Sequence, residues 1–222
     1  MNAPEISVWG DSIAKGIVFD ESRGRYVICK DNCLSRLASD YGLTICNHAV
    51  MGQTSRNGLD RMRSQAMQEG QICVLEYGGN DCDLDWTAVS EHPEQRQMGK
   101  VPLEQFAQNM IEMITHVRAA GMKPLLVTPP PLVAQRYFEW VSRGLSRENI
   151  LSYLGRVEAI FDWQKNYADR VAQIAAELGV RLLDIRTRML EWGDYAQLMC
   201  VDGIHPNALG HELIYEAAAE LL

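Results

Sequence analysis

Three short segments, far apart in the chain, carry the side chains that a nucleophilic acyl-transfer site needs. Gly10-Asp11-Ser12 supplies a serine directly after an apolar run, and Gly78-Gly79-Asn80-Asp81 supplies a side-chain amide after two glycines. Asp202-Gly203-Ile204-His205-Pro206 supplies an aspartate and a histidine three residues apart. A serine nucleophile, a histidine base and an aspartate that orients the histidine form the working set of a serine hydrolase.

The same segments also contain candidate donors for an oxyanion hole. Ser12 follows a predicted strand and should begin a helical turn, where its own backbone N–H can stabilise a developing oxyanion. The side-chain amide of Asn80 and the backbone N–H of Gly52 are the other candidate donors. Each segment also has a simpler interpretation: Asp11 or Ser12 as a helix cap, the Gly-Gly-Asn-Asp run as a turn, and the Asp-x-x-His run as a surface loop.

Other polar residues give weaker signals. Asp81 and Asp83 are interpreted as turn and loop residues, because no matched set of histidines or carboxylates accompanies them. His48 is interpreted as a structural histidine. His211 is followed by glutamate as in a zinc-protease motif, but Tyr215 stands where the second histidine ligand would be. The chain also lacks the glycine-rich phosphate-binding patterns G-x-G-x-x-G and G-x-x-x-x-G-K. The sequence therefore predicts neither a metal nor a cofactor.

Alternating strand and helix patterns must position these residues. Apolar runs typical of buried parallel strands lie at residues 6–9, 43–47, 72–77, 123–128 and 180–184. Helical apolar stripes lie at residues 103–117 and 160–178, and a closing helix is expected at 208–222 with Asn207 as its cap. This alternation predicts one α/β domain over residues 1–222, a three-layer α/β/α sandwich around a five-stranded parallel sheet.

Ligands of such sheets bind beyond the carboxyl ends of the strands. Ser12 and Asn80 fall at predicted strand ends, and Gly52 lies a few residues after the second strand. Two stretches that follow strands, residues 82–100 and 129–149, are interpreted as insertions at this edge that shape a pocket or a lid. Aromatic residues in these insertions include Trp86, Tyr137, Phe138 and Trp140.

The composition is that of a globular protein whose 222 residues can bury a sizeable core. The net charge of −8 argues against nucleic acid, and against a polybasic membrane contact. No apolar run approaches the length of a membrane span, and the first residues lack the pattern of a signal peptide. A cytoplasmic protein with a small-molecule ester as its partner is the expectation; the oligomeric state has no sequence signal.

These segments together resemble the SGNH, or GDSL-type, hydrolase family, and the resemblance covers essentially the whole chain. The family's blocks look like Gly10-Asp11-Ser12-Ile13, the segment around Gly52, Gly79-Asn80-Asp81, and Asp202-x-x-His205-Pro206. Ile13 replaces the leucine of the GDSL name, and the Gly52 segment is a loose match. The resemblance implies a flavodoxin-like sandwich in which Ser12 is nucleophile and oxyanion donor, Gly52 and Asn80 are further donors, His205 is the base and Asp202 orients it.

Three functions are compatible with these features. The first is a serine esterase of small acyl esters, with acetylated carbohydrates as candidate substrates. The second is a lysophospholipase or thioesterase-like enzyme with the same machinery, which a long apolar groove would favour. The third is a non-catalytic flavodoxin-like binding domain, which the missing phosphate loops disfavour. The absence of a G-x-S-x-G elbow argues against the α/β-hydrolase fold.

Overall fold

A five-stranded parallel sheet forms the centre of the computed structural model, which describes residues 5–65 and 71–222. The strand order is β4-β1-β5-β6-β7, and every neighbouring pair is parallel. The sequence prediction of five parallel strands is confirmed, with ends that differ by at most one residue. The strands are β1 (Glu5–Gly10), β4 (Thr44–Asn47), β5 (Ile72–Glu76), β6 (Lys123–Val127) and β7 (Arg181–Leu183).

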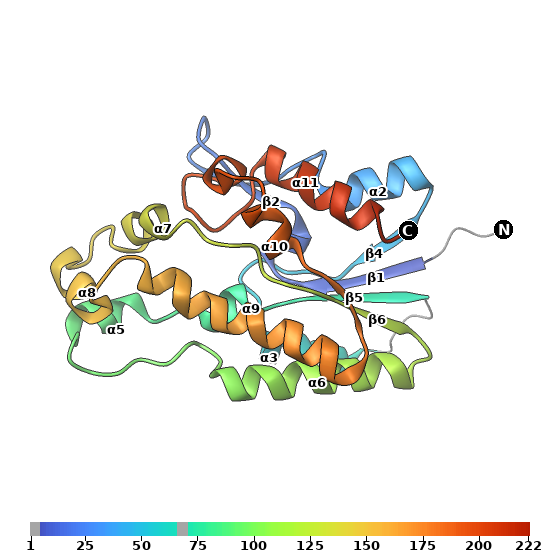
Figure 1. Cartoon of the computed structure of the whole chain (residues 1–222), viewed down its shortest axis with the longest axis horizontal. Coiled ribbons are helices and arrows are strands. Elements are labelled where there is room, and N and C mark those ends of the chain that lie inside the picture. Colours follow the sequence, from blue (N-terminus) through green and yellow to red (C-terminus); the bar gives the residue numbers. More distant parts are fainter. Residues whose placement is uncertain (1–4, 66–70) are drawn as a thin grey trace.

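Helices cover both faces of the sheet, as the predicted three-layer sandwich requires (Figure 1). One face packs against α3 (Ser55–Ser64), α6 (Leu103–Ala119) and α9 (Ala159–Leu178). The other packs against α2 (Cys33–Tyr41), α10 (Ile185–Leu190) and α11 (Ala208–Ala219). Asn207 caps α11 by accepting a hydrogen bond from the Gly210 N–H at 3.1 Å, as expected. Among the described helices, none is long and apolar enough to span a bilayer.

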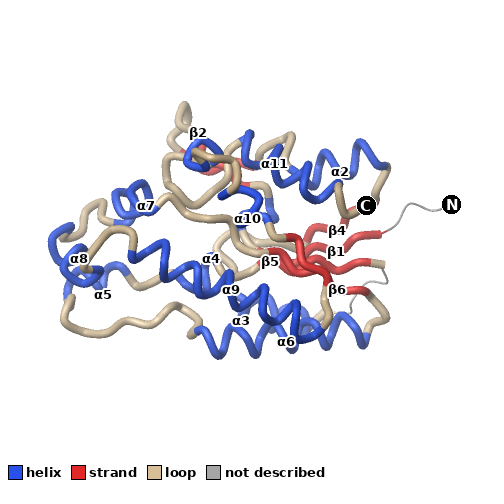
Figure 2. Tube along the Cα trace, viewed as in Figure 1, coloured by secondary structure: helices blue, strands red, loops and turns tan. Residues whose placement is uncertain are grey.

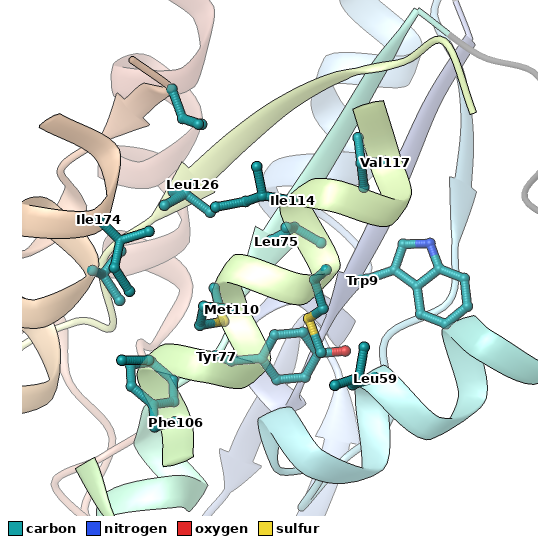
Figure 3. Close-up of a cluster of buried hydrophobic side chains, with 14 of the residues drawn as sticks. Trp9, Leu59, Leu75, Tyr77, Phe106, Met110, Ile114, Val117, Leu126 and Ile174 are labelled. Atoms are coloured by element: carbon teal, nitrogen blue, oxygen red, sulfur yellow. The ribbon is translucent and has the colours of Figure 1, made fainter. Parts of the chain in front are cut away.

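The larger core lies between the sheet and the helices α3, α6 and α9 (Figure 3). The predicted apolar stripe of α6 forms its centre, because the 3-and-4 spacing puts the stripe on one side of the helix. Phe106 is fully buried in this core, with its ring centroid 5.3 Å from that of Tyr167. The other labelled members are Trp9, Leu59, Leu75, Tyr77, Met110, Ile114, Val117, Leu126 and Ile174.

Phe106→Ala is expected to lower the free energy of unfolding by about 3–5 kcal/mol, because it removes a buried ring and leaves a cavity. Urea unfolding should show the loss as a lower midpoint with an unchanged slope. Phe106→Leu is the matched control and should lose much less, since it keeps most of the apolar volume. A loss below about 1 kcal/mol for the alanine variant would contradict the packing described here.

Two additions to the sandwich lie at the carboxyl ends of the strands. The first is an antiparallel hairpin of β2 (Ile17–Asp20) and β3 (Arg25–Ile28), which follows the short helix α1 (Ser12–Lys15). This hairpin was not predicted from the sequence. The second is a helical extension that projects beyond the sheet (Figure 2). Most of both predicted insertions belongs to this extension. It contains α5 (Trp86–Glu91), α7 (Ala134–Val141) and α8 (Arg147–Leu154).

Candidate active site

Ser12 lies in the tight turn where β1 ends and α1 begins. Gly10 permits this turn, because a Cβ there would lie 2.8 Å from the Glu76 backbone oxygen. Asp11 caps the short helix, and its Oδ1 accepts a hydrogen bond from the Ile13 N–H at 2.9 Å. Asp11 therefore has the capping role that was one of the two sequence interpretations. The Ser12 side chain remains at the wall of a cavity.

The structure brings Ser12, His205 and Asp202 into one hydrogen-bonded chain. His205 Nε2 lies 2.9 Å from Ser12 Oγ, and His205 Nδ1 lies 2.6 Å from Asp202 Oδ2. Asp202 is fully buried and His205 nearly so. In this arrangement His205 can accept the proton of the serine hydroxyl while Asp202 fixes the ring and stabilises its charged form.

Several hydrogen bonds hold the loop that carries Asp202 and His205. Asp202 Oδ1 accepts hydrogen bonds from the backbone N–H groups of Ile204 at 3.1 Å and His205 at 3.2 Å. Gly203 has φ +77°, and its carbonyl accepts a hydrogen bond from the Val133 N–H at 2.8 Å. Burial raises the pKa of Asp202, but the hydrogen bond and charge of His205 together with the backbone N–H donors outweigh it, so the net pKa lies below the usual value. Asp202 is therefore an anion beside the imidazole.

Tyr26, on the unanticipated hairpin, completes the surroundings of Asp202. Its hydroxyl donates to Asp202 Oδ2 at 3.0 Å, and its ring centroid lies 5.0 Å from that of His205. Phe19 from β2 and Trp140 from α7 pack edge-on against each other and against Tyr26. The hairpin thus covers the aspartate side of the site. Two short runs rich in Val, Ile and Tyr around a glycine-containing turn were the available sequence signal for it.

Asn80 and Gly52 line the same cavity as Ser12. Asn80 belongs to the one-turn helix α4 (Gly79–Cys82), and its Nδ2 donates to Asp11 Oδ2 at 2.8 Å. Gly52 has φ +76° in a turn closed by the Gln53 N–H and the Val50 carbonyl at 3.1 Å. A side-chain amide and a backbone N–H are the types of donor that serve an oxyanion hole.

Asp81 ties the two donor segments together. Its carboxylate accepts from the Ser55 N–H at 2.9 Å and from the Ser55 hydroxyl, and Asn109 Nδ2 donates to the same hydroxyl at 2.9 Å. Since Ser55 begins α3 directly after the Gly52 turn, this contact fixes that turn against α4. No cluster of metal-ligating side chains occurs within residues 5–65 and 71–222.

A cavity of about 380 Å³ begins at Ser12 and extends to α8 and the start of α9. Its volume lies in the range of small-molecule sites. Both predicted insertions contribute to its wall. Its apolar and aromatic lining includes Leu84, Trp86, Leu132, Tyr137, Tyr153, Leu154, Ile160 and Trp163.

Two polar side chains of the cavity wall, Asp83 and Gln164, already form hydrogen bonds with protein partners. Asp83 accepts from Trp86 Nε1 at 2.8 Å, from the Tyr137 hydroxyl at 2.5 Å and from Lys100 Nζ at 2.8 Å. Gln164 donates to the Pro130 carbonyl at 2.9 Å, and its Oε1 accepts from Arg186 at 2.6 Å. The lining therefore offers an incoming group mainly apolar contact.

Known proteins resemble this chain in both sequence and fold. The model of the GDSL-like Lipase/Acylhydrolase family matches residues 8–213. The mouse protein named isoamyl acetate-hydrolyzing esterase 1 homolog is 24% identical over 99% of this chain and 81% of its own. Its counterpart from Bos taurus is 27% identical over 96% and 78%. A lipase/acylhydrolase from Enterococcus faecalis superposes with a TM-score of 0.70 at 18% identity, covering 98% of this chain and 94% of its own.

The fold and the family match define an ester hydrolase of the α/β/α sandwich type. The chain belongs to the GDSL-like lipase/acylhydrolase family, as its sequence motifs predicted, and it is a carboxylic ester hydrolase.

Proposed function

We propose that this chain is a serine esterase that works through an acyl-enzyme, with Ser12 as the nucleophile. His205 takes the proton of the Ser12 hydroxyl as Oγ attacks the ester carbonyl, and then passes it to the departing alcohol. Water, activated by the same histidine, releases the acid. Asp202 keeps the proton of the histidine on Nδ1 and stabilises the imidazolium. The observation that carries this proposal is the hydrogen-bonded chain from Ser12 through His205 to Asp202.

The oxyanion of the tetrahedral intermediate is assigned to three donors: the backbone N–H groups of Ser12 and Gly52 and the side-chain amide of Asn80. Two observations support this assignment. All three residues line one cavity, and Asn80 donates one of its two Nδ2–H groups to Asp11, which leaves the other for the substrate. Each donor is expected to contribute about 10²–10³ in rate.

The test is covalent labelling by a fluorophosphonate, which reacts with activated serines, followed by mass spectrometry of the peptide that contains Ser12. We expect one phosphonate on Ser12 and a parallel loss of p-nitrophenyl ester hydrolysis. Labelling that is absent, or that falls on another residue, would overturn the proposal. The exposed hydroxyl of Ser22, which donates to Asp20, should remain unlabelled and is the internal control.

The substrate that the cavity favours is a small ester with an uncharged, apolar substituent. The occupied hydrogen-bonding groups of Asp83 and Gln164 leave few partners for sugar hydroxyls, and burying a hydroxyl without a partner is costly. This supports alkyl esters over the acetylated carbohydrates considered from sequence. The relatives named for isoamyl acetate, an ester of a branched alkyl alcohol, agree with that choice. Lysophospholipase or thioesterase activity would require the cavity to accept longer acyl chains.

Ala159→Leu is expected to shorten the far end of the cavity, because Ala159 lies in its wall at the start of α9. Hydrolysis of p-nitrophenyl octanoate should fall by about 10-fold or more, whereas acetate should change little, since a few carbons decide fit in an apolar pocket. The measurement is kcat/KM across the acetate, butyrate and octanoate esters. Ala159→Ser keeps the volume and is the control. An equal loss for all three esters would argue against a cavity that measures chain length.

A further inference from the structure

The carboxyl group of Glu76 lies buried beside Asp11, the residue that precedes Ser12. Glu76 ends strand β5, and its side chain reaches the turn after β1, where its Oε2 accepts from the Asp11 N–H at 3.3 Å. Glu76 is 3% exposed and Asp11 is 1% exposed. No step of the ester hydrolysis described above uses Glu76.

This carboxyl pair lacks an ion-pair partner in the part of the chain that the structure describes. Within residues 5–65 and 71–222, neither Glu76 nor Asp11 forms an ion pair. The titratable groups that face the pair are Tyr77, the next residue along β5, the buried carboxyl of Asp81 from α4, His205, and His211 from α11, which shares a small cavity with Glu76. Two buried carboxyls in contact cannot both ionise without a large cost, so the pair should share a proton.

The surrounding donors decide which carboxyl keeps the charge. Asp11 accepts from the Ile13 N–H at 2.9 Å and from Asn80 Nδ2 at 2.8 Å, and such donors stabilise an anion. Glu76 accepts the longer bond from the Asp11 N–H, and among the described residues its Oε1 has no partner. Burial raises the pKa of both carboxyls. The donors to Asp11 offset part of this effect, whereas the Asp11 charge adds to it and raises the pKa of Glu76 well above its usual value. The proton therefore belongs on Glu76.

We propose that Glu76 is a positioning residue of the oxyanion hole: as a neutral acid it donates a hydrogen bond to the Asp11 carboxylate, which in turn holds the Asn80 amide. This inference rests on the proposed role of Asn80. A neutral Glu76 keeps a second negative charge away from the place where the oxyanion develops. Ionised Glu76 would repel Asp11 and loosen its hold on Asn80.

Two substitutions of similar size separate this role from simple packing. Glu76→Gln keeps a donor toward Asp11 and an acceptor for its N–H, so kcat should stay within about threefold of the wild type. Glu76→Leu has neither, and kcat should fall by about 10-fold or more while KM changes little, because an oxyanion donor acts mainly in the transition state. Asn80→Ala gives the size of the complete loss. Full kcat in the leucine variant, or an equal loss in both variants, would overturn the proposal.

The pH profile adds a readout that packing alone would not move. The wild-type enzyme should lose kcat at alkaline pH as Glu76 ionises, whereas Glu76→Gln should keep its rate there because an amide does not ionise. Identical alkaline limbs in the two proteins would count against the proposal.

Infrared difference spectroscopy tests the protonation state without any turnover. At neutral pH the wild-type minus Glu76→Gln spectrum should contain the C=O stretch of a protonated carboxylic acid. A carboxylate band in its place would overturn the proposal even if the leucine variant failed to fold. Failure of the proposed function looks different, because it would appear as missing phosphonate labelling of Ser12 while this infrared band remained.

Discussion

Ser12→Ala should lower kcat/KM for p-nitrophenyl esters by about 10⁴-fold or more, because the acyl-enzyme cannot form without the serine oxygen. His205 and the oxyanion donors would remain and could still assist direct attack by water, so a small residual rate is expected. The substitution removes one buried hydroxyl whose partner is His205 Nε2 at 2.9 Å. The measurement is the rate for both proteins across the same series of esters.

Controls for this experiment must exclude unfolding and contaminating esterases. Ser22→Ala, which changes an exposed serine in the hairpin turn, should keep the wild-type rate. The thermal midpoint of Ser12→Ala should stay close to that of the wild type, since the change leaves no sizeable cavity. If Ser12→Ala hydrolyses these esters as fast as the wild type, Ser12 is not the nucleophile.

The elements with strong periodicity were predictable from sequence. Burial inside the sheet requires the continuous apolar run at residues 72–77, and packing on the core requires the apolar stripe of α6. Both patterns are therefore visible in the sequence. The hairpin that carries Tyr26 was missed because its strands are short, partly exposed and outside the main sheet. Such strands are stabilised by contacts with distant segments, here α7 and the loop of Asp202, and their local pattern is weak.

Some residues of the candidate site were likewise predictable from sequence, and others were not. Ser12 and Asn80 stand in short motifs at predicted strand ends, so residue types and order were enough to place them at one sheet edge. The Asp-x-x-His motif identified His205 as a candidate but did not place it at that edge. Glu76 has no motif of its own: its position depends on β5 lying beside β1, where Gly10 pairs with Glu76. The occupied state of Asp83 in the cavity wall likewise depends on a contact between the two insertions. Long-range contacts of this kind decide substrate preference and positioning, and they become visible only in three dimensions.

Asp202→Asn should lower kcat/KM by about 10³–10⁴-fold at neutral pH, because the asparagine cannot satisfy its partners and also leave His205 as a base. Asp202 Oδ1 accepts two backbone N–H groups, so the asparagine oxygen should take that place. Its NH₂ then faces His205 Nδ1, which must become the acceptor. The ring proton moves to Nε2, and this tautomer cannot accept the proton of Ser12.

Tyr26→Phe is the matched comparison for Asp202→Asn, since it removes the other hydrogen bond to Oδ2 and keeps the charge. A loss of only a few fold is expected from it, as for a single hydrogen bond. The two variants, assayed for kcat/KM against pH, therefore separate the charge and tautomer control of Asp202 from its support by the hairpin. If Asp202→Asn stayed within 10-fold of the wild type, as Tyr26→Phe should, the orienting role of Asp202 would be contradicted.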